Sequence, residues 1–252
     1  MIDLSYIILY AVIAGIIVGS FLNVCIYRIP REISVNGNHG RSMCTECKKT
    51  LRWFDLIPVI SYCILGGKCR FCKKHISLRY PFIELLNGIL WGFAAYIWGK
   101  SWNTVLYCIF FSVLIIVCMI DWDTMEIPYR FEFIIFGLGV ASVLINGTGS
   151  ILEQIVGIFA ISVPMILITL LCGGFGGGDI QLMAVSGFLL GWKANIVAML
   201  TAVIIAGIYG IVVIIHKKKR KLKIPFGPFL SFGLIFASIW GNKIFDWYIG
   251  LY

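Results

Sequence analysis

The feature that most limits what this chain can fold into is a series of long apolar runs. Of its 252 residues, 60% are hydrophobic and 13% are charged, far outside the range of soluble domains. A helix needs about 20 apolar residues to cross a hydrocarbon layer of about 30 Å, and somewhat fewer where the membrane thins. We therefore expect an all-α polytopic membrane protein with about eight transmembrane helices: Leu4 to Tyr27, Phe82 to Trp98, Val105 to Ile120, Phe131 to Ile145, Ile155 to Cys172, Gln181 to Leu190 (the shortest), Ala194 to His216 and Pro228 to Trp240.

The basic residues predict how these helices are oriented, because Lys and Arg collect in short loops on the cytoplasmic side of a membrane. The stretch from Arg28 to Arg79 carries 11 of the 21 basic residues, and a second basic run covers residues 216–223. With the N-terminus outside, eight spans place both segments, and the loops 121–130 and 173–179, in the cytoplasm. The first span is followed rather than preceded by basic residues, so we expect it to be permanent rather than a cleaved signal.

The net charge of +9 raises the question of a nucleic-acid partner. However, the basic residues flank the predicted spans, where membrane orientation and attraction to anionic lipid headgroups explain them. We therefore expect membrane lipid, and no nucleic acid, as a partner.

Four of the nine cysteines form two C-x2-C pairs, Cys44 with Cys47 and Cys69 with Cys72, separated by 21 residues. Four thiolates in this pattern are typical of a closed structural zinc site. Disulfides or reactive thiols are the alternatives, but the predicted cytoplasmic location disfavours disulfides. The sequence thus predicts three parts: a first helix (1–27), a four-cysteine zinc-binding loop domain (28–81) and a seven-helix membrane domain (82–252).

Two aspartates, Asp121 and Asp179, end or begin apolar runs, and an ionisable group at the edge of a hydrocarbon layer is typical of a functional site. Asp179 could serve only as a helix cap. That role does not explain the glycines before it, of which Gly176 and Gly178 belong to the Gly-x-Gly-Asp pattern. Glycines let another chain approach closely, as a peptide-binding catalytic loop requires.

Two facing carboxyl groups can share one proton, so that one activates water while the other donates to a carbonyl. Asp121 and Asp179 are the pair that we expect to act in this way, with a bell-shaped dependence of rate on pH. Asp123 is the alternative first member, although on a helix it would point to a different side. A cation- or proton-coupled transporter and a membrane scaffold built on the zinc loop are the alternative functions.

Several motifs occur in the order and spacing of one family: Gly19 to Pro30, the four cysteines, Asp55 to Ser61, Arg79 to Leu85, Asp121 seven residues before Pro128, and Gly176 to Asp179. In these motifs the chain resembles, over nearly its full length, the type IV prepilin peptidases, which are bifunctional leader peptidases and N-methyltransferases of the bacterial cytoplasmic (inner) membrane. The resemblance implies that Asp121 and Asp179 are catalytic and that cleavage of prepilin-like or pseudopilin precursors occurs at the cytoplasmic face.

The resemblance also implies methylation of the new N-terminus with S-adenosylmethionine, because family members that lack the cysteine loop are peptidases only. Candidate contacts to the methyl donor are Asn23, Arg79 and Glu84, for which packing or interface anchoring is the alternative role. The chain departs from the family at Tyr129, where an acid or amide is common, and at Gln181, where lysine is common. Neither change removes a proton-transfer group, so we expect cleavage to be little affected. A peptidase without methyltransferase activity is the main alternative function.

Overall fold

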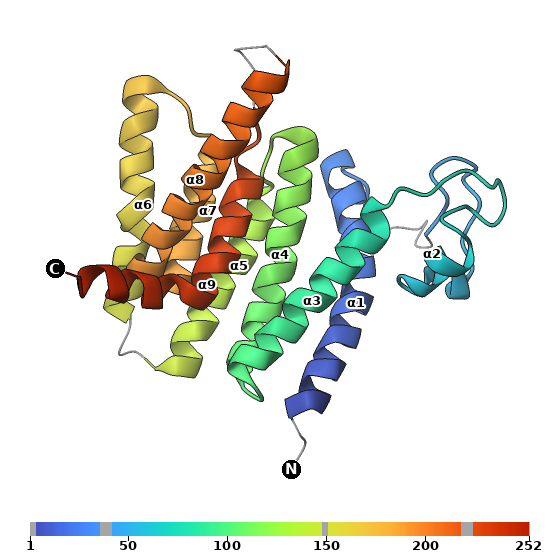
Figure 1. The fold of residues 1–252 in the computed structure, drawn as a ribbon, viewed down its shortest axis with the longest axis horizontal. Coiled ribbons are helices and arrows are strands. Elements are labelled where there is room, and N and C mark those ends of the chain that lie inside the picture. Colours follow the sequence, from blue (N-terminus) through green and yellow to red (C-terminus); the bar gives the residue numbers. More distant parts are fainter. Residues whose placement is uncertain (1–3, 36–41, 148–150, 218–223, 252) are drawn as a thin grey trace. The chain divides into compact units, whose positions relative to one another are not determined.

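The computed structural model describes residues 4–35, 42–147, 151–217 and 224–251 (Figure 1). Within these ranges the regular structure is helical, apart from two isolated β-bridges. The helices are α1 (Leu4–Arg28), α2 (Ile60–Ile64), α3 (Arg79–Trp98), α4 (Trp102–Thr124), α5 (Tyr129–Asn146), α6 (Ile151–Cys172), α7 (Gly177–Leu190), α8 (Trp192–Lys217) and α9 (Gly227–Ile249), with the 3-10 turns η1 (Ile29–Arg31) and η2 (Trp53–Leu56). The predicted all-α fold is confirmed.

Among the described residues, seven helices are long and apolar enough to cross a membrane, and each coincides with a predicted span. The remaining prediction, Gln181 to Leu190, falls within α7, which begins earlier, at Gly177, and has only 14 residues. At about 1.5 Å per residue, α7 is about 21 Å long, which is shorter than a full hydrocarbon crossing. Within the described ranges the structure thus has seven candidate full-length spans, with α7 as a shorter apolar helix.

Proline and glycine set several helix boundaries. Pro128 directly precedes α5, and Pro228 lies in the first turn of α9, where its missing N–H has no helical partner to lose. The helices α3, α5 and α7 end at Gly99, Gly147 and Gly191, all with positive φ. These residues explain why the helices are interrupted where they are, although the surrounding composition stays apolar.

The chain divides into two compact units, Met1–Ile116 and Val117–Tyr252, and the end of α4 belongs to the second. The sequence analysis limits the zinc-binding loop domain to residues 28–81, from the end of the first predicted span to the start of the second. These limits stay a prediction. The first unit contains the cysteine loop, whereas the second contains both predicted catalytic aspartates.

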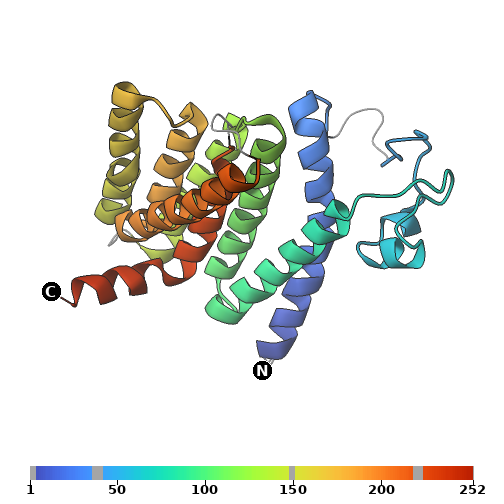
Figure 2. The ribbon, with the colours of Figure 1, turned by 45° about the horizontal axis from the view of Figure 1, so that its top comes forward.

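Close packing of α1 on α3 organises the first unit, and both views show these helices side by side (Figures 1 and 2). A Cβ atom on Gly15 would lie 2.9 Å from the Gly88 Cα, and one on Gly19 would lie 2.7 Å from the Glu84 Cα. The amide of Asn87 donates to the Gly15 carbonyl over 2.7 Å. Small residues and a buried amide are the features that hold helices together where lipid removes the hydrophobic driving force.

The second unit uses the same features between α6, α7 and α8. A Cβ atom on Gly157 would lie 2.2 Å from the Gly187 carbonyl oxygen, so the two backbones are in direct contact. The Asn195 amide donates to the carbonyls of Gly157 and Met183 over 3.2 and 3.1 Å. This contact fixes α7 against its neighbours at the end opposite to Asp179.

We predict that Gly187→Ala destabilises the second unit. Its Cβ would meet the Gly157 oxygen at 2.1 Å and the Asn195 amide nitrogen at 2.5 Å. Overpacking of this kind costs about 1–3 kcal/mol, which should lower the thermal unfolding temperature measured in detergent. Gly137→Ala is the matched control, because nothing lies within 4 Å of its Cβ position. Equal unfolding temperatures for the two variants would contradict the packing argument.

Candidate active site

Asp121 lies in the last turn of α4 and is buried. The backbone N–H of Gly227, which begins α9, donates to its Oδ2 over 2.8 Å. The backbone carbonyl of Asp121 accepts from the Met125 N–H over 2.8 Å. Met125 has a φ of +58°, which turns the chain away from the direction of α4. The carboxyl group is thus fixed by a residue that is distant in sequence.

Asp179 is the third residue of α7 and is partly buried. The Gly176 N–H donates to its Oδ2 over 3.2 Å, in the arrangement of a residue that caps its own helix from the first turn. The capping role considered as an alternative is therefore present. It does not exclude a catalytic role, because the bond uses Oδ2 alone.

The loops that hold the two carboxyl groups are in contact. The rings of Phe175 and Phe226 have centroids 5.5 Å apart, and each ring immediately precedes the glycine that donates to an aspartate. The structure therefore brings together the loops that carry the two aspartates predicted as a pair.

The glycines of the predicted catalytic loop have different surroundings. A Cβ atom on Gly178 would lie 3.0 Å from the Ile127 Cβ, so Gly178 permits close contact with the loop that follows Asp121. Gly176 contributes its N–H to Asp179, whereas a Cβ on Gly177 would meet nothing within 4 Å. Gly176 and Gly178 thus have geometric roles that Gly177 lacks.

Asp123, the alternative first member of the pair, is exposed, whereas Asp121 is buried. The difference follows from their separation by two residues on a helix, which turns the side chains to different sides. Burial next to a fixed N–H donor favours Asp121.

Gly227 is the site residue that sequence reasoning missed, because the last predicted span began only at Pro228. The Phe-Gly dipeptide that Gly227 shares with Gly176 also occurs at Gly137 and Gly233, so it could not have identified the site. A Cβ at Gly227 would lie 2.7 Å from the Asp121 Oδ2.

Three residues predicted to contact a methyl donor lie in the first unit and make contacts within it. The Glu84 carboxylate accepts from the Val59 N–H over 2.8 Å and from the Ser20 side chain. The Asn23 amide donates to the Tyr80 carbonyl over 3.2 Å. The backbone N–H of Arg79 donates to the Ser77 hydroxyl oxygen over 3.2 Å. These contacts support the alternative packing roles of Glu84 and Asn23.

The structure brings the four predicted metal ligands together: the sulfur atoms of Cys44, Cys47, Cys69 and Cys72 all lie within 4.8 Å of one another. The two pairs have equivalent surroundings. Cys44 accepts from the Lys48 N–H and Cys69 from the Lys73 N–H, both through their carbonyl oxygens, and each lysine has a φ between +55° and +59°. A β-bridge closes each pair, Met43 with Thr50 and Lys68 with His75. The cluster can hold a metal ion.

The thiols influence one another's protonation. A hydrogen bond from the Cys72 N–H, opposed in part by burial, lowers the pKa of Cys69 to about 7. The Lys74 N–H lowers the pKa of Cys72, but burial and the neighbouring thiols outweigh it and raise the value to about 11. Cys69 thus loses its proton more readily than Cys72, and a bound cation would favour the thiolate form of both.

The structure places five further cysteines outside this cluster: Cys25, Cys63, Cys108, Cys118 and Cys172. The described residues show no second group of histidine, cysteine and carboxylate side chains able to hold a metal.

Comparison with known proteins gives matches along most of the chain. Residues 13–98 match the bacterial peptidase A24 N-terminal domain, and residues 108–211 match the type IV leader peptidase family. The chain is 35% identical to the prepilin leader peptidase/N-methyltransferase of Bacillus subtilis, over 94% of this chain and 96% of that protein. It is 32% identical to the protein of the same name from Neisseria gonorrhoeae, over 99% and 98%. No solved structure matches the chain.

We predict that Glu84→Ala loosens the cysteine loop from α1 and α3, because the variant leaves the Val59 N–H and Ser20 without their shared acceptor. A hydrogen bond to a charged group contributes about 1.5–3 kcal/mol. Trypsin should therefore cut the loop several-fold faster in the folded protein. Glu84→Gln, which keeps an acceptor oxygen, should show a smaller increase. Unchanged cleavage of both variants would show that Glu84 does not hold the loop.

Proposed function

The chain belongs to the type IV leader peptidase family, and we propose that it is a membrane-embedded aspartic endopeptidase that removes the leader peptide of prepilin-like precursors. The names of its relatives support a second activity, methylation of the new N-terminus. Family membership does not support the transporter and scaffold hypotheses.

One observation carries the proposed chemistry: Asp121 and Asp179 come from separate helices, and each is held by the N–H of a glycine in two loops that touch. Two carboxyl groups that face each other across a small gap do not both ionise easily, so in our proposal the pair retains one proton. This is the state that an aspartic protease requires.

The reaction that we propose uses this shared proton. The ionised carboxylate removes a proton from a water molecule, whose oxygen attacks the carbonyl carbon of the scissile peptide bond, while the protonated carboxyl group donates to the carbonyl oxygen. The carbon–nitrogen bond then breaks: the carboxyl group that took the proton from water gives it to the leaving amine of the mature chain, and the other carboxylate takes a proton back from a hydroxyl group of the tetrahedral intermediate. Both carboxyl groups end in their starting states.

The loops that form the site support a cytoplasmic location for it. The segments after α4, before α7 and before α9 meet at Ile127, Gly178 and Gly227. With α7 taken as a short eighth crossing, charge counting assigns all three to the cytoplasmic side, with the amino end of α1 outside, in the bacterial cytoplasmic membrane. Most of the basic run that leads into α9, residues 218–223, lies outside the described residues.

For the cysteine cluster we propose structural zinc, because four thiolates are a donor set that zinc prefers. Six basic residues near the cysteines, Lys48, Lys49, Lys68, Arg70, Lys73 and Lys74, offset the charge of such a centre. S-adenosylmethionine would supply the methyl group for the second activity. The side chains of Glu84 and Asn23 are engaged in hydrogen bonds that join α1, α3 and the cysteine loop. These contacts do not favour a role of either residue in binding S-adenosylmethionine.

We predict that Asp121→Asn and Asp179→Asn each abolish leader cleavage. An amide can neither accept the proton from water nor donate as a carboxylic acid does. The assay incubates purified variants with a prepilin precursor and reads product masses. Asp123→Asn is the matched control and should retain cleavage, because Asp123 is exposed. Cleavage by Asp179→Asn at the native rate would remove that carboxyl group from the mechanism.

We predict that Gly227→Ala lowers the cleavage rate at least tenfold, because its Cβ would lie 2.7 Å from the Asp121 Oδ2 and displace the carboxyl group. Gly177→Ala is the control in the neighbouring loop, where a Cβ meets nothing within 4 Å. It should cleave at nearly the native rate. The reverse order of the two rates would contradict the proposed geometry.

We predict about one zinc ion per chain in protein purified under reducing conditions, measured by elemental analysis. Cys69→Ser should lose the metal and make the loop sensitive to protease, because a structural site contributes folding free energy. Cys63→Ser, which removes an exposed thiol outside the cluster, should keep it. Equal metal content in the two variants would exclude the cluster as the site.

A further inference from the structure

The cysteine loop exposes a group of large apolar side chains that lies outside the candidate membrane spans. Trp53 is 78% exposed, Ile60 56% and Ile64 76%, and Leu56 and Ile57 are exposed beside them. Ile60 and Ile64 lie one turn apart on α2, so both point to the same side. We call Trp53, Leu56, Ile57, Ile60 and Ile64 the apolar face. Such a face in a basic loop requires a partner to cover it.

The hydrogen bond between Val59 and Glu84 shows at which level along α1 and α3 the apolar face lies. Glu84 is the sixth residue of α3, so it lies about 7.5 Å from the start of that helix. Its second partner, Ser20, lies about 12 Å before the end of α1. Both helices are candidate spans. The backbone at Val59, directly before α2, therefore lies beside the spans at a level well inside their ends.

The charge of the loop indicates what kind of surface the apolar face meets. Residues 42–78 contain seven Lys and Arg residues and two acidic residues, Glu46 and Asp55. Both acidic residues are already in ion pairs, Glu46 with Lys74 and Asp55 with Arg70. A zinc centre with four thiolates would carry a double negative charge, and the loop would still be basic. Anionic partners are attracted and basic ones are repelled.

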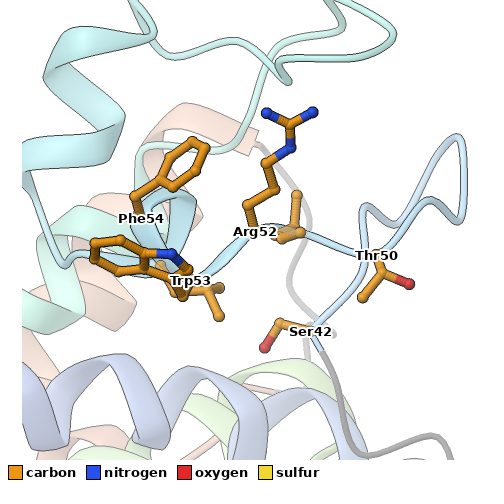
Figure 3. A pocket seen from close by; sticks show the side chains of 7 residues that line it. Ser42, Thr50, Arg52, Trp53 and Phe54 are labelled. Carbon is orange, nitrogen blue, oxygen red and sulfur yellow. The ribbon is translucent and has the colours of Figure 1, made fainter.

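A hollow of about 550 Å³ lies next to the apolar face and shares Trp53 and Leu56 with it. Figure 3 shows the rings of Trp53 and Phe54 on one side of this hollow and the hydroxyl groups of Ser42 and Thr50 on the other. The guanidinium group of Arg52 lies 6.0 Å from the centre of the Phe71 ring, and the Lys49 ammonium lies 5.3 Å from it. The hollow thus combines the cation of Arg52, two hydroxyl groups and an indole beside an apolar surface. Lys49 does not line the hollow, but its ammonium contacts the same Phe71 ring as Arg52.

We propose that the apolar face inserts into the same bilayer that holds α1 and α3, and that the hollow binds the headgroup of an anionic lipid. Aromatic and aliphatic side chains of the apolar face lie at the headgroup boundary, where an indole ring is favoured. Arg52 contacts the lipid phosphate, Lys49 adds positive charge beside the hollow, and the hydroxyl groups of Ser42 and Thr50 complete the site. Docking fixes the four-cysteine cluster to the membrane surface, in addition to the Glu84 contact.

The test measures the share of tryptophan emission that is lost when lipid brominated near the headgroup replaces ordinary lipid. The full-length protein, with its eight tryptophans, is placed in bilayer discs of phosphatidylcholine and phosphatidylglycerol. If Trp53 touches lipid, Trp53→Phe removes a quenched emitter, and the quenched share falls. If Trp53 lies in water, the same change removes an unquenched emitter, and the share rises or stays the same, which would overturn the proposal.

Trp102→Phe is the matched reference, because Trp102 is 74% exposed and begins the candidate span α4. Its removal should lower the quenched share by a comparable amount. The contribution of Trp53, taken as the difference between native protein and Trp53→Phe, should grow when phosphatidylglycerol is added. In a Lys49→Gln/Arg52→Gln variant with normal metal content, that growth should be lost. Equal growth in this variant would exclude the headgroup site. Neither result depends on peptidase activity.

Discussion

The buried carboxyl group of Asp121 depends on a hydrogen bond from a backbone N–H 106 residues away in the chain. A carboxyl group at the end of a membrane-spanning helix loses hydration and needs a fixed donor. Gly227 supplies it, and only glycine fits because a Cβ would overlap the carboxylate. Asp179 has a local donor, Gly176, and the paired rings of Phe175 and Phe226 join the two arrangements. The site therefore exists only where three loops of the second unit meet.

Helix packing holds those loops in register. Glycine pairs bring backbones into contact between α6 and α7, and the Asn195 amide connects α8 to both. The first unit repeats this solution between α1 and α3 with glycines and Asn87. In lipid, where apolar surface gains little by packing on apolar surface, close van der Waals contact and buried amide bonds supply the cohesion. Because these contacts hold the helices together, the loops between them can position the polar groups of the site.

Local patterns identified most elements because their physical causes are local. Span-length apolar runs predicted the seven long helices, since hydrocarbon requires backbone groups to be paired within the segment. The spacing of the four cysteines predicted a cluster that the structure forms. The start of α7 was predicted less accurately, at Gln181 instead of Gly177. Gly177 and Gly178 lower the apolar content of its first turn without ending the helix. Gly227 was missed because its partner is distant in sequence.

The sequence by itself determined the helical class and the apolar spans, and it predicted the four cysteines that cluster and the two aspartates proposed as catalytic, because each depends on composition or on spacing within a short segment. Only the tertiary structure decided that Asp121 rather than Asp123 is buried, that Gly227 is its donor, and that Glu84 holds the cysteine loop. The physical reason is that burial and hydrogen-bond partners arise from contacts between segments far apart in the chain, which local periodicity does not encode.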